Sequence, residues 1–185
     1  MKRLISLGLG LLLAMSVLGI AEAATSSDTL ELYVTVTGDL SVTIIEAGLP
    51  FGSVAANDSS VLTSSATVRN DSTGLTESYR IKGSNSVPSN WTLASTPDED
   101  QFVLYAAFAN TEPSGVWADD DLEWGDQDCT SDVFSYDGTQ TGVDVPASVG
   151  NDRALWFRID TPTSLTVGVD EPQTITVTVT AYIPS

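Results

Sequence analysis

The segment that decides the fold, residues 173–183, reads QTITVTVTAYI. Its apolar positions are Ile175, Val177, Val179, Ala181 and Ile183, and they alternate with Thr174, Thr176, Thr178, Thr180 and Tyr182. A period of two with many β-branched residues is typical of a half-buried β-strand. We therefore expect a strand with one face on a core, while its threonine face meets water or a neighbour.

A second segment with the same period lies near the start of the chain. Leu30, Leu32, Val34 and Val36 alternate with Glu31, Tyr33 and Thr35, which predicts a strand over residues 29–36. A short polar leader, residues 24–28, precedes it. Because such a strand can pair with the sheet edge of a neighbouring molecule, we predict that these four apolar residues form an assembly strand.

Shorter strand patterns fill the chain between these two segments. We expect strands at residues 39–46, 51–54, 61–70, 75–83, 91–94, 101–108, 132–136, 143–145 and 153–159, with a tight turn at Gly38 and Asp39. No convincing amphipathic helix follows residue 23. The pattern predicts an all-β protein, a single antiparallel β-sandwich of immunoglobulin-like or jelly-roll type.

Three short motifs support that fold by resemblance. FGSV at residues 51–54, ATVRN at residues 66–70 and YRI at residues 79–81 resemble the FGxV and TVxN pattern of immunoglobulin-like modules, over about residues 40–84. The TITVTVTA strand at residues 174–181 also resembles those of exported bacterial surface and fibre proteins. The resemblance implies a sandwich with a structural or adhesive role, and it brings no catalytic residue.

The first 23 residues have the features of a secretory signal peptide. Lys2 and Arg3 precede an apolar run over residues 4–20, and AEA at residues 21–23 supplies a cleavage pattern. We expect one domain, residues 24–185, that is secreted or held at the cell surface without membrane insertion after cleavage.

The composition excludes several functions. The chain has a net charge of −18, and loss of residues 1–23 removes two of seven basic and one of 25 acidic residues, leaving −19. Such a charge disfavours binding to nucleic acid and to anionic membranes. Histidine is absent, as are a GxSxG motif and a glycine-rich phosphate loop, so we expect no enzyme activity. A hydrophobic content of 42% favours a folded core.

The single cysteine, Cys129, cannot form a disulfide within the chain. We expect a buried, inert thiol, and the alternative is an intermolecular disulfide.

An acidic loop at about residues 110–130 is the one candidate for a metal site. Its candidate ligands are Asp119, Asp121, Glu123, Asp126 and Asp128. A flexible loop can supply the six to eight oxygen ligands that calcium takes, and the alternative is a solvated loop without any cofactor. Trp117 and Trp124 flank the acidic run; we expect them to anchor the loop, and the alternative is that they stack on a carbohydrate.

Taken together, the sequence predicts an exported structural or adhesive surface protein. We expect a fibre or coat subunit that assembles by β-strand addition, with itself or another surface protein as partner. The alternative is an extracellular calcium- or carbohydrate-binding module centred on residues 115–130.

Overall fold

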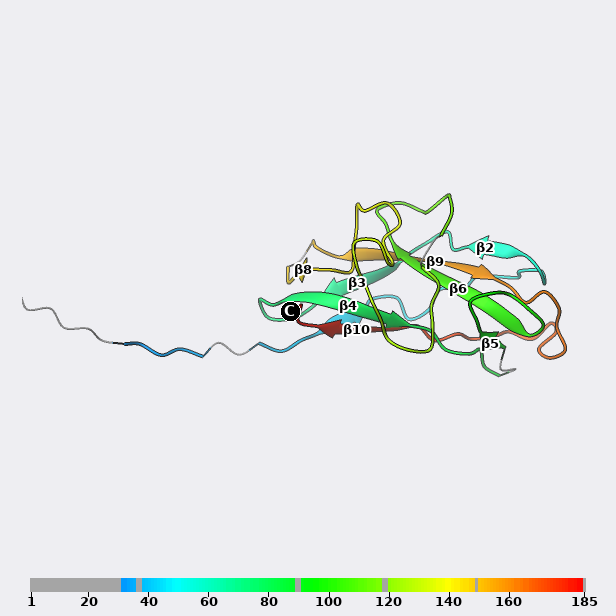
Figure 1. The fold of residues 1–185 in the computed structure, drawn as a ribbon, viewed down its shortest axis with the longest axis horizontal. Helices are drawn as coiled ribbons and strands as arrows, with labels where there is room; N and C mark the ends of the chain where they lie inside the picture. Colours follow the sequence, from blue (N-terminus) through cyan, green and yellow to red (C-terminus); the bar gives the residue numbers. More distant parts are fainter. Residues whose placement is uncertain (1–30, 36–37, 89–90, 118–119, 149, 185) are drawn as a thin grey trace, which may run out of the picture. The chain divides into compact units, whose positions relative to one another are not determined.

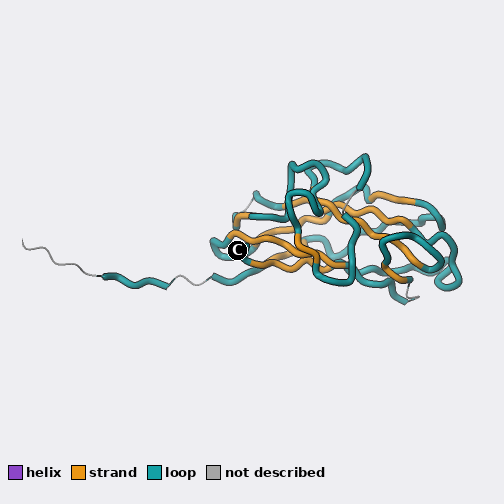
Figure 2. Tube along the Cα trace, in the orientation of Figure 1, coloured by secondary structure: helices purple, strands orange, loops and turns teal. Residues whose placement is uncertain are grey.

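The computed structural model describes residues 31–35, 38–88, 91–117, 120–148 and 150–184. The chain divides into two compact units, Met1–Thr35 and Val36–Ser185. The expected signal peptide lies outside the described residues. The described ranges form strands and loops only, as Figure 2 shows, and they include no helix long and apolar enough to span a membrane.

Two sheets pack against each other, so the fold is the predicted all-β sandwich (Figure 1). The six-stranded sheet runs in the order β1 (Val42–Ile44), β3 (Ala66–Asn70), β9 (Arg153–Asp160), β6 (Gln101–Phe108) and β5 (Thr92–Leu93), with β2 (Ser59–Val61) also paired to β9. The four-stranded sheet runs β10 (Thr178–Tyr182), β4 (Thr76–Lys82) and β7 (Gln127–Asp128), with β8 (Val145–Pro146) also paired to β4. These pairs are antiparallel, apart from the parallel pair β5–β6.

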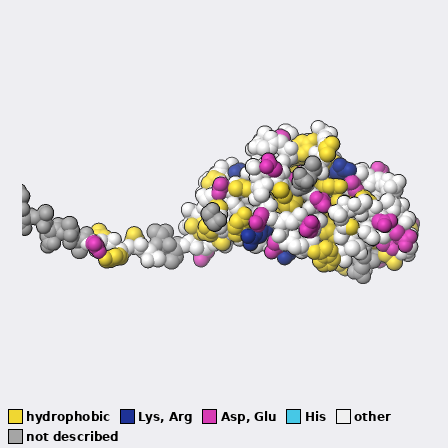
Figure 3. Space-filling view, viewed as in Figure 1, with side chains coloured by type: hydrophobic (Ala, Val, Ile, Leu, Met, Phe, Trp, Pro, Cys, Tyr) yellow, Lys and Arg dark blue, Asp and Glu magenta, His cyan; other side chains and the backbone are white. Residues whose placement is uncertain are grey.

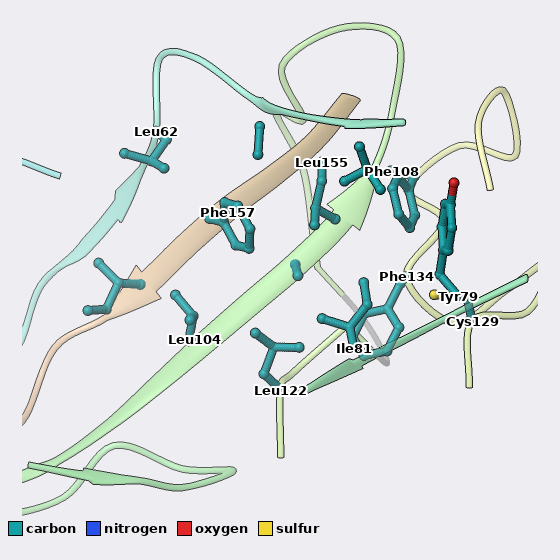
Figure 4. Packing of buried hydrophobic residues seen from close by; sticks show 14 of the residues in the cluster. Leu62, Tyr79, Ile81, Leu104, Phe108, Leu122, Cys129, Phe134, Leu155 and Phe157 are labelled. Carbon is teal, nitrogen blue, oxygen red and sulfur yellow. The ribbon is translucent and has the colours of Figure 1, made fainter. Parts of the chain in front are cut away.

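The core lies between the sheets and follows the strand alternation. On β4, Tyr79 and Ile81 are fully buried, whereas Arg80 lies on the opposite, partly exposed face. Figure 4 shows Tyr79 and Ile81 across the core from Leu155 and Phe157 of β9. Strand β6 is buried on both faces, because a second cluster of Ala107, Ala109, Trp117 and Trp156 covers the outer face of the larger sheet.

Residues 109–147 close one side of the sandwich by hydrogen bonding to both sheets. Toward β6, the amide of Ala106 donates to Asp120 O (2.8 Å) and the amide of Phe108 donates to Phe134 O (2.9 Å). Toward β4, the amide of Tyr79 donates to Gly142 O at 2.7 Å. The described residues of this segment, which includes the loop expected at about residues 110–130, therefore seal the edges of β6 and β4 that face away from β9 and β10.

Two predicted strands are absent because left-handed backbone interrupts them. Gly52 has φ +74° within residues 51–54, and Phe134 has φ +57° within residues 132–136. An extended strand cannot continue through such a residue. Ser135 forms only an isolated bridge with Phe108.

The predicted strand over residues 61–70 is divided by a bulge. Val61 pairs with Arg158, and Ala66 pairs with Leu155, so five steps on one side of β9 match three steps on β9 itself. The two extra residues disrupt the ladder and produce β2 and β3.

The two ends of the expected sandwich also differ from their prediction. Residues 31–35 have no strand structure, so the strand expected over residues 29–36 is not formed there; Leu30 and Val36 lie outside the described residues. The described residues 38–40 show no turn where one was expected at Gly38 and Asp39, and residue 37 beside them lies outside the described residues. The last strand is confined to Thr178–Tyr182, although the alternation of burial extends back to residue 174.

Candidate functional site

One side of the sandwich is left open at β1 and β10. These are the terminal strands of the two sheets, and they lie in contact with each other. Each is paired on one side only, to β3 and to β4 respectively. No other strand in the described part of the chain pairs with the outer edge of either one.

The core-facing side chains along these two strands are only partly buried. They are Val42 and Ile44 of β1, with Ile175, Val177, Val179 and Ala181 of β10 and the residues leading into it. On the opposite side, Leu122 is 1% exposed and Phe134 and Val145 are both 0% exposed. We call the outer edges of β1 and β10, with these six partly buried residues, the open edge.

The outer face of β10 is polar, as its sequence predicted. Thr174, Thr176, Thr178 and Thr180 are exposed. On the same sheet, the guanidinium of Arg80 lies 4.3 Å from the ring centroid of Tyr182. The two faces of β10 are therefore distinct: an apolar row toward the core and a threonine row toward solvent.

The described part of the predicted assembly strand, residues 31–35, exposes its apolar side chains. Leu32 and Val34 are both 85% exposed, and Tyr33 between them is 88% exposed. Residues 31–35 themselves have no strand structure. Contiguous exposed apolar surface is a feature of interaction sites, so this segment is a candidate for binding.

The described part of the acidic loop does not group four of the predicted ligands into a metal site. Lys82 Nζ lies 3.1 Å from Asp126 Oδ1, and Arg80 pairs with Asp128, so β4 holds two of the five carboxylates in ion pairs. Asp119 lies outside the described residues. Among the residues that are described, no three acidic or thiol side chains, Asp121 and Glu123 included, are grouped to hold a metal ion.

The two tryptophans that flank the acidic run differ. Trp117 is 4% exposed, and its ring centroid lies 6.4 Å from that of Tyr105 and 6.1 Å from that of Tyr136, so it is the predicted anchor. For Trp124 that prediction was wrong, because its side chain is 58% exposed. A hydrogen bond from the amide of Glu123 to Gln127 Oε1 closes a loop that leaves Trp124 at its tip.

Cys129 is buried, as expected, with 2% of its surface exposed. Burial, with a smaller contribution from the charge of Asp128, raises the pKa of its thiol to about 12. A protonated, inaccessible thiol is a poor nucleophile and a poor partner for an intermolecular disulfide.

Glu77 is a buried acid that the sequence reasoning missed. It is fully buried, and its Oε1 accepts a hydrogen bond from the amide of Ser41 at 2.8 Å. Its Oε2 has no hydrogen-bond partner in the described part of the protein. Its burial could have been predicted from the sequence, because Glu77 lies two and four residues before the core-facing Tyr79 and Ile81 and therefore on the same face of the strand. This hydrogen bond joins Ser41, directly before β1, to strand β4 of the opposite sheet.

Comparison with known proteins identifies no relative: no family model matches the chain, and no curated protein or solved structure matches it significantly. Three structural features therefore bear on function: the open edge, the exposed segment at residues 31–35, and the acidic loop with its two ion pairs to β4.

Proposed function

We propose that this protein is an exported structural subunit that assembles into a surface fibre or coat by β-strand addition. Residues 30–36 of one copy would supply the added strand, and a sheet edge of the next copy would receive it. The observation that carries this proposal is the coexistence, in one chain, of exposed aliphatic residues at alternate positions and an open edge.

Strand β10 lacks the devices that usually prevent edge pairing. Soluble β-proteins protect edge strands with charged residues, proline, bulges or covering loops. Residues 173–183 contain neither a charged residue nor a proline, and five of them form the regular ladder of β10 with β4. An edge without such protection would favour uncontrolled aggregation, so in an exported protein it is better explained as an assembly surface.

The competing class, a calcium- or carbohydrate-binding module, has less support. Two of its candidate calcium ligands, Asp126 and Asp128, are engaged by Lys82 and Arg80. Trp117 is too buried to stack on a sugar, which leaves Trp124 as the exposed aromatic residue of that pair.

The test is assembly of residues 24–185 compared with residues 38–185, which lack the predicted strand. Negative-stain electron microscopy and light scattering are carried out over the same range of concentrations. We expect regular fibres or sheets from the longer protein and a folded monomer from the shorter one. Equal assembly by both would show that residues 30–36 are not the joint, and dispersed monomers of the longer protein at every concentration would contradict the proposal.

A further inference from the structure

We propose that the receiving edge is the outer edge of β10 in a second copy of this chain. This inference rests on the proposed assembly and specifies its site. Residues 30–36 of one copy would lie beside residues 175–181 of the next, with their apolar side chains toward the core of the sandwich that receives them.

The two segments match in length and in pattern. Residues 30–36 have apolar side chains at four alternate positions, and residues 175–181 also have four, at Ile175, Val177, Val179 and Ala181. At about 3.3 Å per residue, each seven-residue segment spans about 23 Å. The four residues of the acceptor are all only partly buried, so the added strand would cover them further and extend the core.

The polar faces are compatible as well. With its apolar residues inward, the added strand would place Tyr33 and Thr35 on the outer face, in line with the threonine row of β10. Threonine and aromatic side chains make favourable neighbours across strands. Its one acidic residue, Glu31, would face uncharged threonines on β10, with Arg80 and Lys82 one strand further away.

Strand β1, the other half of the open edge, fits less well. It is a three-residue strand, and over the same length of seven residues, 40–46, the chain has apolar side chains at only three alternate positions, Leu40, Val42 and Ile44, with Glu46 at the fourth. A stretch of β1 therefore cannot match the four apolar positions of residues 30–36.

A hairpin with β1 in the same chain also fails on register. If Gly38 and Asp39 formed a two-residue turn, Thr35 would lie opposite Val42, and Val34 opposite Thr43. Facing residues share one side of a sheet, so Val34 would point outward with the exposed Thr43, and Thr35 would point toward the core. The apolar face of residues 30–36 therefore suits a second molecule better than its own β1.

Disulfide formation between two single-site variants tests the assignment. Protein carrying Thr35→Cys is mixed with protein carrying Thr174→Cys, Thr176→Cys, Thr178→Cys or Thr180→Cys, each with a different mass tag, under mild oxidation. All five positions lie on polar faces and are exposed, so the substitutions leave the core intact. The native Cys129 stays in place because it is buried. Thr43→Cys, on the exposed face of β1, is the matched control.

We expect disulfide-linked dimers of mixed mass with at least one β10 variant. Their yield should be about fivefold or more above that of the Thr43→Cys control, because facing Cβ atoms in paired strands lie about 4.5–5.5 Å apart. Electron microscopy of the same mixtures separates the two claims. Assembly with cross-linking to Thr43→Cys, or to none of these sites, would overturn the β10 assignment and leave the proposed function standing. Absence of both assembly and cross-linking would overturn both.

Discussion

At the scale of single residues, the two tryptophans of the acidic loop differ in burial although they are the same residue type. Trp117 and Trp124 lie seven positions apart on either side of the acidic run, yet one is 4% and the other 58% exposed. The sequence predicted the same anchoring role for both, because the local pattern does not show which indole packs against Tyr105 and Tyr136.

This difference predicts a large contrast in stability. Trp117→Ala should lower the free energy of unfolding by about 3–5 kcal/mol, because it removes a buried aromatic side chain from the second cluster. Trp124→Ala should change it by no more than about 0.5 kcal/mol, as is usual for an exposed position. Urea denaturation of both variants measures the contrast, and equal losses would show that Trp117 is not the anchor.

Two buried groups predict a loss of stability at alkaline pH. Burial raises the pKa of Cys129 to about 12 from an ordinary 9.0, and burial together with the charge of Glu77 raises the pKa of Tyr79 above its ordinary 10.0. Above pH 9 the unfolded chain therefore releases protons that the folded chain retains, so the free energy of unfolding falls as pH rises. Below pH 9 both states keep these protons, and the contribution is constant.

Thermal unfolding between pH 7 and pH 10.5 checks this linkage. The melting temperature should fall above pH 9 in the wild type and fall less in Cys129→Ser and in Tyr79→Phe. Tyr79→Phe should be no less stable than the wild type at pH 7, because the hydroxyl has no hydrogen-bond partner among the described residues. A decline as steep in both variants as in the wild type would assign it to other groups.

At the scale of elements, alternation predicted the strands and local backbone geometry limited the prediction. Residues 101–108 and 153–159 correspond closely to β6 and β9, because both segments contain long stretches of apolar residues that the sandwich buries. Residues 51–54 and 132–136 have similar patterns, but Gly52 and Phe134 adopt left-handed backbone, which an apolar pattern does not reveal. The ion pairs of Asp126 and Asp128 with β4 were likewise beyond reach, because they require the pairing of β7 with β4.

The two faces of residues 30–36 give a matched pair of variants. Leu32→Asp with Val34→Asp adds two charges to the apolar face, and Tyr33→Asp with Thr35→Asp adds the same two to the polar face. We expect the first variant to remain monomeric in light scattering, since its charges would enter the core of the receiving sandwich. The second should still assemble, and loss of assembly in both would attribute the effect to charge alone.

At the scale of the whole molecule, self-association must overcome electrostatic repulsion. The chain has a net charge of −18, and on the face shown in Figure 3 Asp and Glu side chains lie at many separate places while Lys and Arg are few. Copies of the protein therefore repel one another at low ionic strength.

Salt should then promote assembly. Raising the ionic strength from about 0.01 M to about 0.1 M shortens the screening length from about 30 Å to about 10 Å and weakens this repulsion. Sedimentation velocity at a fixed protein concentration should show a larger assembled fraction at the higher salt concentration. Dissociation on adding salt would mean that ion pairs, rather than apolar strand addition, hold the copies together.

The asymmetry of the sandwich links these scales. Residues 109–147 seal one side with backbone hydrogen bonds, while β1 and β10 leave the other side partly exposed. The sequence predicted both alternating segments, but only the sheet order shows that β10 is a terminal strand with a free edge.

The most direct test of strand addition is calorimetric titration of a peptide of residues 29–37 into residues 38–185. The shortened protein lacks that segment and retains β1 to β10, the strands that the structure describes. We predict saturable binding of one peptide per protein, lost in a peptide carrying Leu32→Asp and Val34→Asp. Absence of binding at peptide concentrations up to about 1 mM, equivalent to a binding free energy weaker than about −4 kcal/mol, would contradict the account.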